Sequence, residues 1–345
     1  MKSSFPVVCL LWLAASCSSI RYAGIETYNP AGVTFPEGVK KVLVLNNASA
    51  QREVPFESTV RRLPDSVKIA ADSAVMVFCR ALGQQIADSP YFEDVRLLDG
   101  CYRTDARALV EEKLTQNEIR RLCEEHEVDA VISLDRLLFY IREDVERISW
   151  TDTEIRIRVE VSGVLRAAVP DGNTPLAAVY LSDTVMPSLS PEDYYGGDAS
   201  FLPAPEYMLQ EVAAYMASES HVNFVPYWSA DTRWYYLSPD SRWKEATACV
   251  VAEKWDEASA KWEALYERAA SWKAKARLAS NRALCAEMSG QLTQALHWAT
   301  LAHQHFSAHP ETGAHTLVRQ KSYISVLERR IAVEEILRRQ LKTAN

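Results

Sequence analysis

The sequence lacks the short motifs that mark common enzyme classes. No nucleophile elbow, phosphate-binding loop or dinucleotide-binding fingerprint occurs in its 345 residues. Positive charge is also scarce, because 38 lysines and arginines face 46 acidic residues and the formal net charge is −8. An acidic chain gains nothing from the phosphates of a nucleic acid. We therefore expect a non-enzymatic protein without a nucleic-acid partner.

Cysteines at metal-binding or redox spacing are also missing. There is no CxxC motif, and the spacing after residue 17 matches no zinc pattern. Five cysteines remain there: Cys79, Cys101, Cys123, Cys249 and Cys285. An odd number leaves at least one thiol unpaired within the chain. Most have apolar neighbours at helical spacing, so we expect buried free thiols, with a Cys79–Cys101 disulfide as the alternative.

Histidines cluster without the partners that a metal site needs. His297, His303, His305 and His309 lie near one predicted helix end. No carboxylate or thiol stands in register with them, so the cluster predicts a polar helix terminus rather than a metal site. We expect neither a metal nor a cofactor.

Apolar runs long enough to cross a bilayer are absent. The run from Phe5 to Ala15 is interrupted by Pro6 and is shorter than the roughly 20 residues of a transmembrane helix. With Lys2 before it, the run is typical of a signal peptide, which we predict over residues 1–16. No second such run follows, so no transmembrane helix is expected.

The predicted signal peptide ends at a lipidation motif. The stretch Leu13-Ala14-Ala15-Ser16-Cys17 resembles the bacterial lipobox, although Ala14 stands where that pattern usually has leucine. The resemblance implies that Cys17 carries diacylglycerol and becomes the first residue; plain secretion is the alternative. Ser18, where an aspartate is absent, resembles the residue after the cysteine in lipoproteins sent to the outer membrane. No acidic run follows Cys17, so the sequence lacks the surface-export signal that some Bacteroidota lipoproteins carry. We expect a lipid-anchored protein that faces the periplasm.

After Cys17, a segment with prolines and glycines, which break regular structure, is followed by segments with strand and helix patterns. Residues 17–38 predict a lipidated cysteine and a flexible spacer, because prolines and glycines recur from Pro30 onward. Residues 39–225 predict an α/β domain with a mixed sheet. Its strands are expected at 42–45, 92–98, 128–139, 154–161 and 176–185, and its helices from Asp72 to Pro90, after the capping box Thr115–Glu118, and at 205–218.

Aromatic residues mark two candidate binding regions. The loop from Pro187 to Pro205 carries Tyr194 and Tyr195, and it is either a binding loop or an ordinary crossing loop. A belt over residues 224–243, which includes Trp228, Trp234 and Tyr235, either stacks on a sugar or peptide or joins two domains. We interpret residues 226–243 as an aromatic linker.

The last segment, residues 244–345, predicts helices only. Glu253, Ala258 and Trp262 align with Gly290, Ala295 and Ala299, each pair 37 residues apart. This pattern resembles the tetratricopeptide repeat, which implies paired antiparallel helices; a generic helical bundle is the alternative. The period exceeds the usual length, and Glu253 replaces the turn glycine. A helix from Glu311 to Lys342 is expected to cap the array.

Taken together, these segments resemble an uncharacterised family of Bacteroidota lipoproteins with tetratricopeptide-like C-termini. The resemblance rests on the lipobox, the strand at 41–45, Asp129–Ile132 and the step Pro226-Tyr227-Trp228. The motifs of that family are structural rather than catalytic, so the resemblance implies no active site. Our leading hypothesis is a membrane-anchored adaptor whose helical repeats or aromatic belt bind another envelope protein. A glycan- or peptidoglycan-binding lipoprotein is the first alternative, and a hydrolase is the second.

Overall fold

The computed structural model describes residues 20–49, 51–58, 66–67, 71–103, 111–147, 153–170, 176–187 and 205–343. The chain divides into two compact units. The sheet unit comprises Tyr28–Tyr227 with Glu335–Asn345, and the helical unit comprises Met1–Thr27 with Trp228–Glu334. Among these described ranges, none of the helices is both long enough and apolar enough to cross a membrane.

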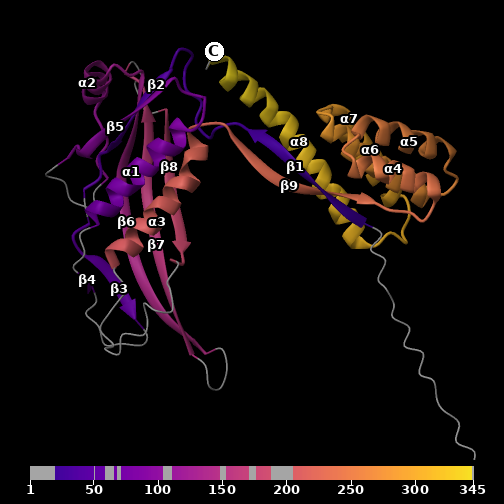
Figure 1. Cartoon of the computed structure of the whole chain (residues 1–345), viewed down its shortest axis with the longest axis horizontal. Helices are drawn as coiled ribbons and strands as arrows, with labels where there is room; N and C mark the ends of the chain where they lie inside the picture. Colours follow the sequence, from indigo (N-terminus) through magenta and orange to yellow (C-terminus); the bar gives the residue numbers. More distant parts are fainter. Residues whose placement is uncertain are drawn as a thin grey trace, which may run out of the picture. The chain divides into compact units, whose positions relative to one another are not determined.

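The sheet unit is built on a mixed β-sheet (Figure 1). Its strands are β2 (Lys41–Asn46), β3 (Val54–Ser58), β4 (Ser66–Val67), β5 (Asp94–Cys101), β6 (Ala130–Arg147), β7 (Thr153–Ala168) and β8 (Ala177–Val185). Strand β2 is parallel to β5 and β6, whereas β6, β7 and β8 are antiparallel in series. This arrangement confirms the predicted mixed sheet.

Helices cover both faces of β2. Val42 and Val44 share a core with α1 (Asp72–Ala87) and α3 (Pro205–Ser220), which lie on one face of the sheet (Figure 1). Leu43 and Leu45 share a second core with α2 (Gln116–His126). A strand covered on both faces requires a continuous apolar run, which is why this segment was predictable.

Helix α2 begins at the predicted capping box. The Thr115 hydroxyl accepts a hydrogen bond from the Glu118 amide at 3.3 Å, and the Glu118 carboxylate accepts one from the Thr115 amide at 2.7 Å. Two amides at the helix start are satisfied in this way. The prediction is confirmed.

Strands β6 and β7 pair over most of their length and contain one irregularity. Ile157 and Val159 are buried, whereas Arg156 and Arg158, which alternate with them, are partly exposed, so one face of this strand is covered and the other is partly wet. The register shifts between Leu134 and Arg136. This β-bulge separates Asp135 from the regular pairing, and such bulges often redirect a side chain.

Side-chain amides take the place of a neighbouring strand at two positions in the sheet unit. Gln51 accepts a hydrogen bond from the Phe139 amide at 2.9 Å and donates one to the Phe139 carbonyl at 3.0 Å. Gln340, near the end of the chain, makes the same pair with Ala31 at 2.9 and 3.0 Å. Each amide reproduces the N–H and C=O of one strand residue, so buried backbone groups stay satisfied.

The prediction of a flexible spacer is wrong for residues 20–38. Strand β1 (Ile20–Asn29) occupies the first part, which contains no proline; the first proline is Pro30. The remainder is fixed in the sheet unit, where Phe35 is 2% exposed and the Val33 amide donates to the Asn223 carbonyl at 2.8 Å.

The prediction of an aromatic linker over residues 226–243 is also wrong. Strand β9 (Tyr227–Tyr236) occupies this segment and pairs with β1 in a two-stranded sheet. Aromatic side chains favour the extended backbone of a strand. The partner strand lies about 200 residues earlier, as the bond of 3.0 Å between the Thr27 and Ser229 hydroxyls illustrates.

The helical unit continues with a series of helices, as predicted. They are α4 (Ser241–Val251), α5 (Trp255–Arg268), α6 (Trp272–Met288), α7 (Leu292–Ser307) and α8 (Ala314–Thr343). The residues of α8 after Glu334 belong to the sheet unit. Trp262 fills the core with 0% exposure. Asn281 of α6 forms an amide pair with the backbone of Tyr236, at 2.7 and 2.9 Å.

Candidate functional site

The predicted binding residues do not form one exposed surface. Cys17, Tyr194 and Tyr195 lie outside the described residues. Trp228 is 67% exposed, whereas Tyr235 is 3% exposed and therefore belongs to the core. Trp234 packs edge-on against Tyr323, with 5.2 Å between ring centroids. Tyr236 is also 3% exposed, so both faces of β9 are covered at this end, and its aromatic residues mainly join the strand to the helices of the same unit.

The five cysteines among the described residues are free thiols, and all but Cys101 are buried. Burial raises the pKa of Cys79 and Cys285 to about 12 and that of Cys123 to about 11. Such thiols are poor nucleophiles because the thiolate is the reactive form. Cys101 is exposed rather than buried, and it is not bonded to Cys79.

The histidines pack against aromatic rings. The His305 Nε2 lies 3.0 Å from the Tyr266 hydroxyl, and burial lowers the pKa of His305. The His309 ring stacks on Trp272 with 3.9 Å between centroids. Among the described residues, no group of three histidine, cysteine or acidic side chains is placed to hold a metal ion.

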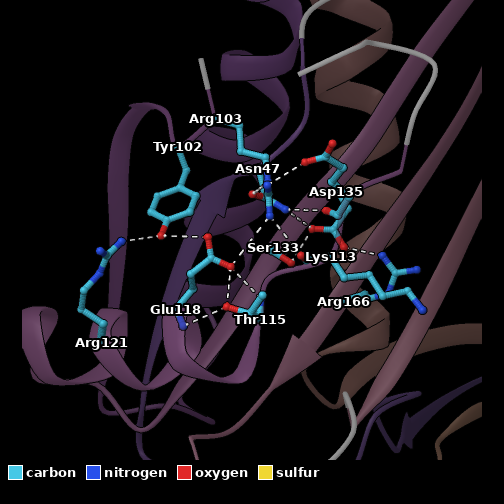
Figure 2. A network of polar contacts seen from close by, with 11 residues as sticks. Asn47, Tyr102, Arg103, Lys113, Thr115, Glu118, Arg121, Ser133, Asp135 and Arg166 are labelled. Carbon is cyan, nitrogen blue, oxygen red and sulfur yellow. Dashed lines mark hydrogen bonds and ion pairs between the residues drawn. The ribbon is translucent and has the colours of Figure 1, made fainter. Parts of the chain in front are cut away.

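The most connected polar site of the sheet unit surrounds Asp135 (Figure 2). Its side chain is 0% exposed, at the bulge of β6 and beside the end of β2. The carboxylate accepts hydrogen bonds from the Ser133 hydroxyl and the Asn47 amide, both at 2.8 Å, and from the Arg166 guanidinium. Open α/β sheets commonly place their sites at such strand ends.

Asn47, which directly follows β2, links the Asp135 carboxylate to the segments around Arg103 and Glu112. Its amide nitrogen also donates to the Glu112 carbonyl at 2.8 Å, and its carbonyl oxygen accepts from Arg103 Nε at 2.9 Å. Figure 2 shows Asn47 between Arg103 and Asp135. Three elements that are distant in sequence therefore meet at one amide.

Arg103 joins two segments that lie on either side of residues 104–110. Its guanidinium forms an ion pair with Glu112 at 2.7 Å and donates to the Lys113 carbonyl at 3.0 Å. The Glu118 carboxylate lies 3.9 Å away. Residues 101–103 and 111–118 are thus fixed to the sheet at a common point.

The charges of this site balance one another. Burial opposes the charge on Arg166, but its bonds to Glu111 and Asp135 outweigh burial and raise its pKa. The hydrogen bond from Arg166 lowers the pKa of Glu111, against the opposing effect of burial. Ionised groups whose bonds are made by protein partners hold a structure together rather than transfer protons. The site is therefore structural in character.

The helical unit has a comparable buried carboxylate at Glu287. Its side chain is 0% exposed and lies 3.1 Å from Arg233 Nε of β9. It also accepts from the Tyr323 hydroxyl at 2.8 Å and pairs with Arg330, both on α8. Burial, followed by the charge of Glu287, raises the pKa of Tyr323 well above its ordinary value.

Neither buried carboxylate was identified from the sequence. Asp135 interrupts the predicted strand at 128–139, and Glu287 follows several apolar positions of a predicted helix. A charged residue inside an apolar segment was the available signal, since buried charges need partners. Their arginine partners lie 31 and 54 residues away, so no local pattern identified the pairs.

A pocket of about 320 Å³ lies elsewhere on the sheet unit. Glu160 and Asp183 contribute acidic side chains to its lining. Glu160 pairs with Arg142 at 3.6 Å, and the Asp183 carboxylate accepts from the Thr184 amide at 2.7 Å. Both acidic side chains of the lining therefore already have partners within the protein.

Comparison with known proteins identifies two families, neither of known function. The model of a domain of unknown function (DUF8603) matches residues 39–236, and that of a second domain of unknown function (DUF6340) matches residues 244–329. No curated protein matches the chain.

Two solved structures resemble part of the chain. One is a PelC dodecamer from Paraburkholderia phytofirmans, with 12% identity, 59% of this chain and 99% of that chain covered, and a TM-score of 0.25. The other is a neuraminyllactose-binding hemagglutinin homolog from Helicobacter pylori, with 11% identity, 57% and 97% covered, and a TM-score of 0.25. Similarity at this level carries no argument about function.

Proposed function

The chain belongs to the DUF8603 family, a domain of unknown function, and we propose that it is a non-enzymatic, lipid-anchored adaptor of the bacterial cell envelope. In this proposal Cys17 holds the protein to the outer membrane, facing the periplasm. The helical unit binds a partner protein through tetratricopeptide-like repeats. The sheet unit is a rigid body whose polar groups bond to one another.

One observation carries the proposal, namely that a turn of the helical unit recurs after 37 residues. Glu253 between α4 and α5 has φ 57°, and Gly290 between α6 and α7 has φ 74°. The hydrogen bond from Lys254 to Cys249, at 2.9 Å, has its counterpart from Gln291 to Ala286 at 2.8 Å. Repeated helix pairs that stack in this way present extended surfaces for binding proteins.

The packing of the two helix pairs supports the same interpretation. Ala258 and Ala295 occupy equivalent positions and are both 0% exposed. Alanine lets neighbouring helices approach closely, which the repeat requires at the helix crossing. From the other side, Tyr323 and Leu327 of α8 pack with Ala295, as expected of a capping helix.

The adaptor role is tested by cross-linking in intact cells. The full chain should yield a defined cross-linked species, and Trp262→Ala, which empties the core of the first helix pair, should abolish it. Trp228→Ala is the matched control, because Trp228 is 67% exposed and Trp262 is 0% exposed. Recovery of the protein alone with several cross-linker lengths, or equal loss in both variants, would count against an adaptor.

The anchor is tested separately through Cys17→Ala. Each buried methylene of an acyl chain contributes about 0.8 kcal/mol, and two chains hold a protein stably on a membrane. The variant should move from the membrane fraction to the soluble fraction. Continued sedimentation with the outer membrane would show that protein contacts, rather than lipid, hold it there.

Glycan binding is the second candidate, and Trp228 is the ring that favours it. Its large exposure suits stacking on a sugar, whereas Tyr235 is buried. Peptidoglycan fragments should then shift the tryptophan fluorescence of the full chain, and Trp228→Ala should remove the shift. An unchanged spectrum over a broad glycan panel would exclude this candidate.

A further inference from the structure

A small pocket of the helical unit is lined by more basic than acidic side chains, although the chain as a whole is acidic. Its volume is about 230 Å³. Basic side chains enter it from α6 and α8: Lys273, Arg277 and Arg319. One acidic residue, Glu311, lines it as well, and its carboxylate lies 3.5 Å from His309. The lining therefore carries an excess of positive charge.

The two arginines have aromatic neighbours but no acidic partner within ion-pair distance in the part of the chain that the structure describes. Arg277 lies over the Tyr236 ring at 5.4 Å, and Arg319 lies over the Trp234 ring at 5.7 Å. No hydrogen bond joins the guanidinium of Arg277 or Arg319 to another group of the described residues. Because both side chains line the pocket, their terminal nitrogens can donate to a bound anion, in the planar arrangement that matches a phosphate.

Two helix starts reinforce this positive potential. Helix α6 has 17 residues and begins at Trp272, and no side-chain cap is formed at Ser271. Helix α8 has 30 residues and begins at Ala314, next to Gly313 and Thr312 of the pocket lining. Amides and helix dipoles at such starts attract anions.

The volume and the lining residues of the pocket limit the class of ligand that it can bind. Trp272, Phe306 and Tyr236 contribute aromatic surface. A volume of about 230 Å³ lies below the roughly 300–1,000 Å³ of pockets that enclose drug-sized molecules. Three cations and two helix starts suit a group that carries close to two negative charges, as a phosphate monoester does near neutral pH.

We propose that this pocket binds a phosphate group, carried either by a membrane lipid headgroup or by a soluble phosphate ester. Ile20, which lines the pocket, follows Cys17 by three residues, and three residues span at most about 10 Å. If Cys17 is lipidated as proposed above, the pocket lies within reach of the headgroups around the anchor. Only the source of the phosphate rests on that proposed function.

Isothermal titration of the full chain with inorganic phosphate at low ionic strength tests the site. Arg277→Gln and Arg319→Gln should each weaken binding by about tenfold or more, because each removes a charge-assisted bond. Arg277→Lys, which keeps a charge, should restore part of the affinity. Arg329→Gln is the matched control, since Arg329 is an exposed residue of α8 outside the pocket. Thermal unfolding of each variant checks that the fold is retained.

Two further probes distinguish the sources of phosphate. In one arm, chain carrying Cys17→Ala is floated with vesicles of phosphatidic acid, whose headgroup is a phosphate monoester, or of phosphatidylcholine; in the other, glycerol 3-phosphate replaces inorganic phosphate. Flotation with phosphatidic acid that requires Arg277 indicates a headgroup, and binding of the soluble ester alone indicates a soluble ligand. Absence of saturable phosphate binding, or equal loss in Arg329→Gln and Arg277→Gln, overturns the proposal. Release of Cys17→Ala from membranes is measured separately, so failure of the pocket and failure of the anchor remain distinct.

Discussion

Asp135 in the sheet unit and Glu287 in the helical unit are both carboxylates with 0% side-chain exposure, but their surroundings differ. Asp135 has two neutral donors and one cation, and that cation is shared with Glu111. Glu287 has two arginines and a phenol. Asp135 thus shares its one cation, Arg166, with a second carboxylate, whereas two arginines converge on the single carboxylate of Glu287.

The difference follows from what each carboxylate joins. Asp135 lies where β2 ends and a bulge interrupts β6, so the neutral side chains of Asn47 and Ser133 are available as donors. Glu287 lies inside α6, whose own amides are used within the helix, and its donors come from side chains of β9 and α8. A charge buried between regular elements therefore depends more heavily on ion pairs.

The sharpest test is Glu287→Gln, for which we expect the free energy of unfolding of the helical unit to fall by about 4 kcal/mol, since breaking a buried ion pair costs roughly 3–5 kcal/mol. The amide nitrogen of glutamine would face a second donor, on Arg233 or Arg330. Urea unfolding followed by tryptophan fluorescence measures the effect, because seven of the nine tryptophans lie in residues 228–298. Glu328→Gln, on an exposed position of α8, should change stability by less than about 0.5 kcal/mol. A similar loss of unfolding free energy in both variants would show that the buried ion pairs of Glu287 do not stabilise the unit more than an exposed carboxylate does.

Asp135→Asn is the matched change in the sheet unit, with an expected loss of about 3 kcal/mol, the low end of the range for a broken buried pair. The loss is smaller because Arg166 retains Glu111 as a partner. Hydrogen exchange measured by mass spectrometry should show faster exchange in residues 101–103 and 130–135, with unchanged exchange in α6. If this variant is less stable than Glu287→Gln, the contrast between one shared cation and two converging arginines is wrong.

The amide pairs allow a comparison without charges. Gln51→Ala and Asn281→Ala each leave a buried backbone N–H and C=O without partners, at Phe139 and Tyr236. We expect each to lower the free energy of unfolding by about 2 kcal/mol. Chemical denaturation of both variants should give equal losses, because the same two bonds are removed. Gln84→Ala, an exposed position of α1, serves as the control.

The elements that the sequence predicted correctly are those with a local cause. The apolar run Val42–Leu45 and the capping box at Thr115 each follow from neighbouring residues, and both were found. Strands β1 and β9 were missed because each depends on a partner about 200 residues away. A strand that forms through such a distant contact has no sequence pattern that separates it from a linker.

The same limit applies to the candidate sites. Tyr235 belongs to an aromatic cluster that suggested binding, yet it is buried in the core together with Tyr236, because both faces of this end of β9 are covered. The partners of Asp135 come from residues 47, 133 and 166, which only the fold brings together. The basic pocket combines β1, β9, α6 and α8 in the same way, so its arginines could be recognised only after the fold was known.

The smallest changes in stability are expected from substitutions in the two turns of the helical repeat, and they should have opposite signs. Gly290 and Glu253 both have positive φ, and a Cβ at Gly290 would meet no atom within 4 Å. Gly290→Ala should therefore destabilise the unit through backbone strain alone, by about 1 kcal/mol. Glu253→Gly should instead stabilise it by roughly 0.5 kcal/mol, because relief of strain is partly offset by the greater freedom of glycine in the unfolded chain. The midpoints of urea unfolding should shift in opposite directions, and a shift in the same direction would mean that the two turns are not equivalent and that the repeat is only apparent.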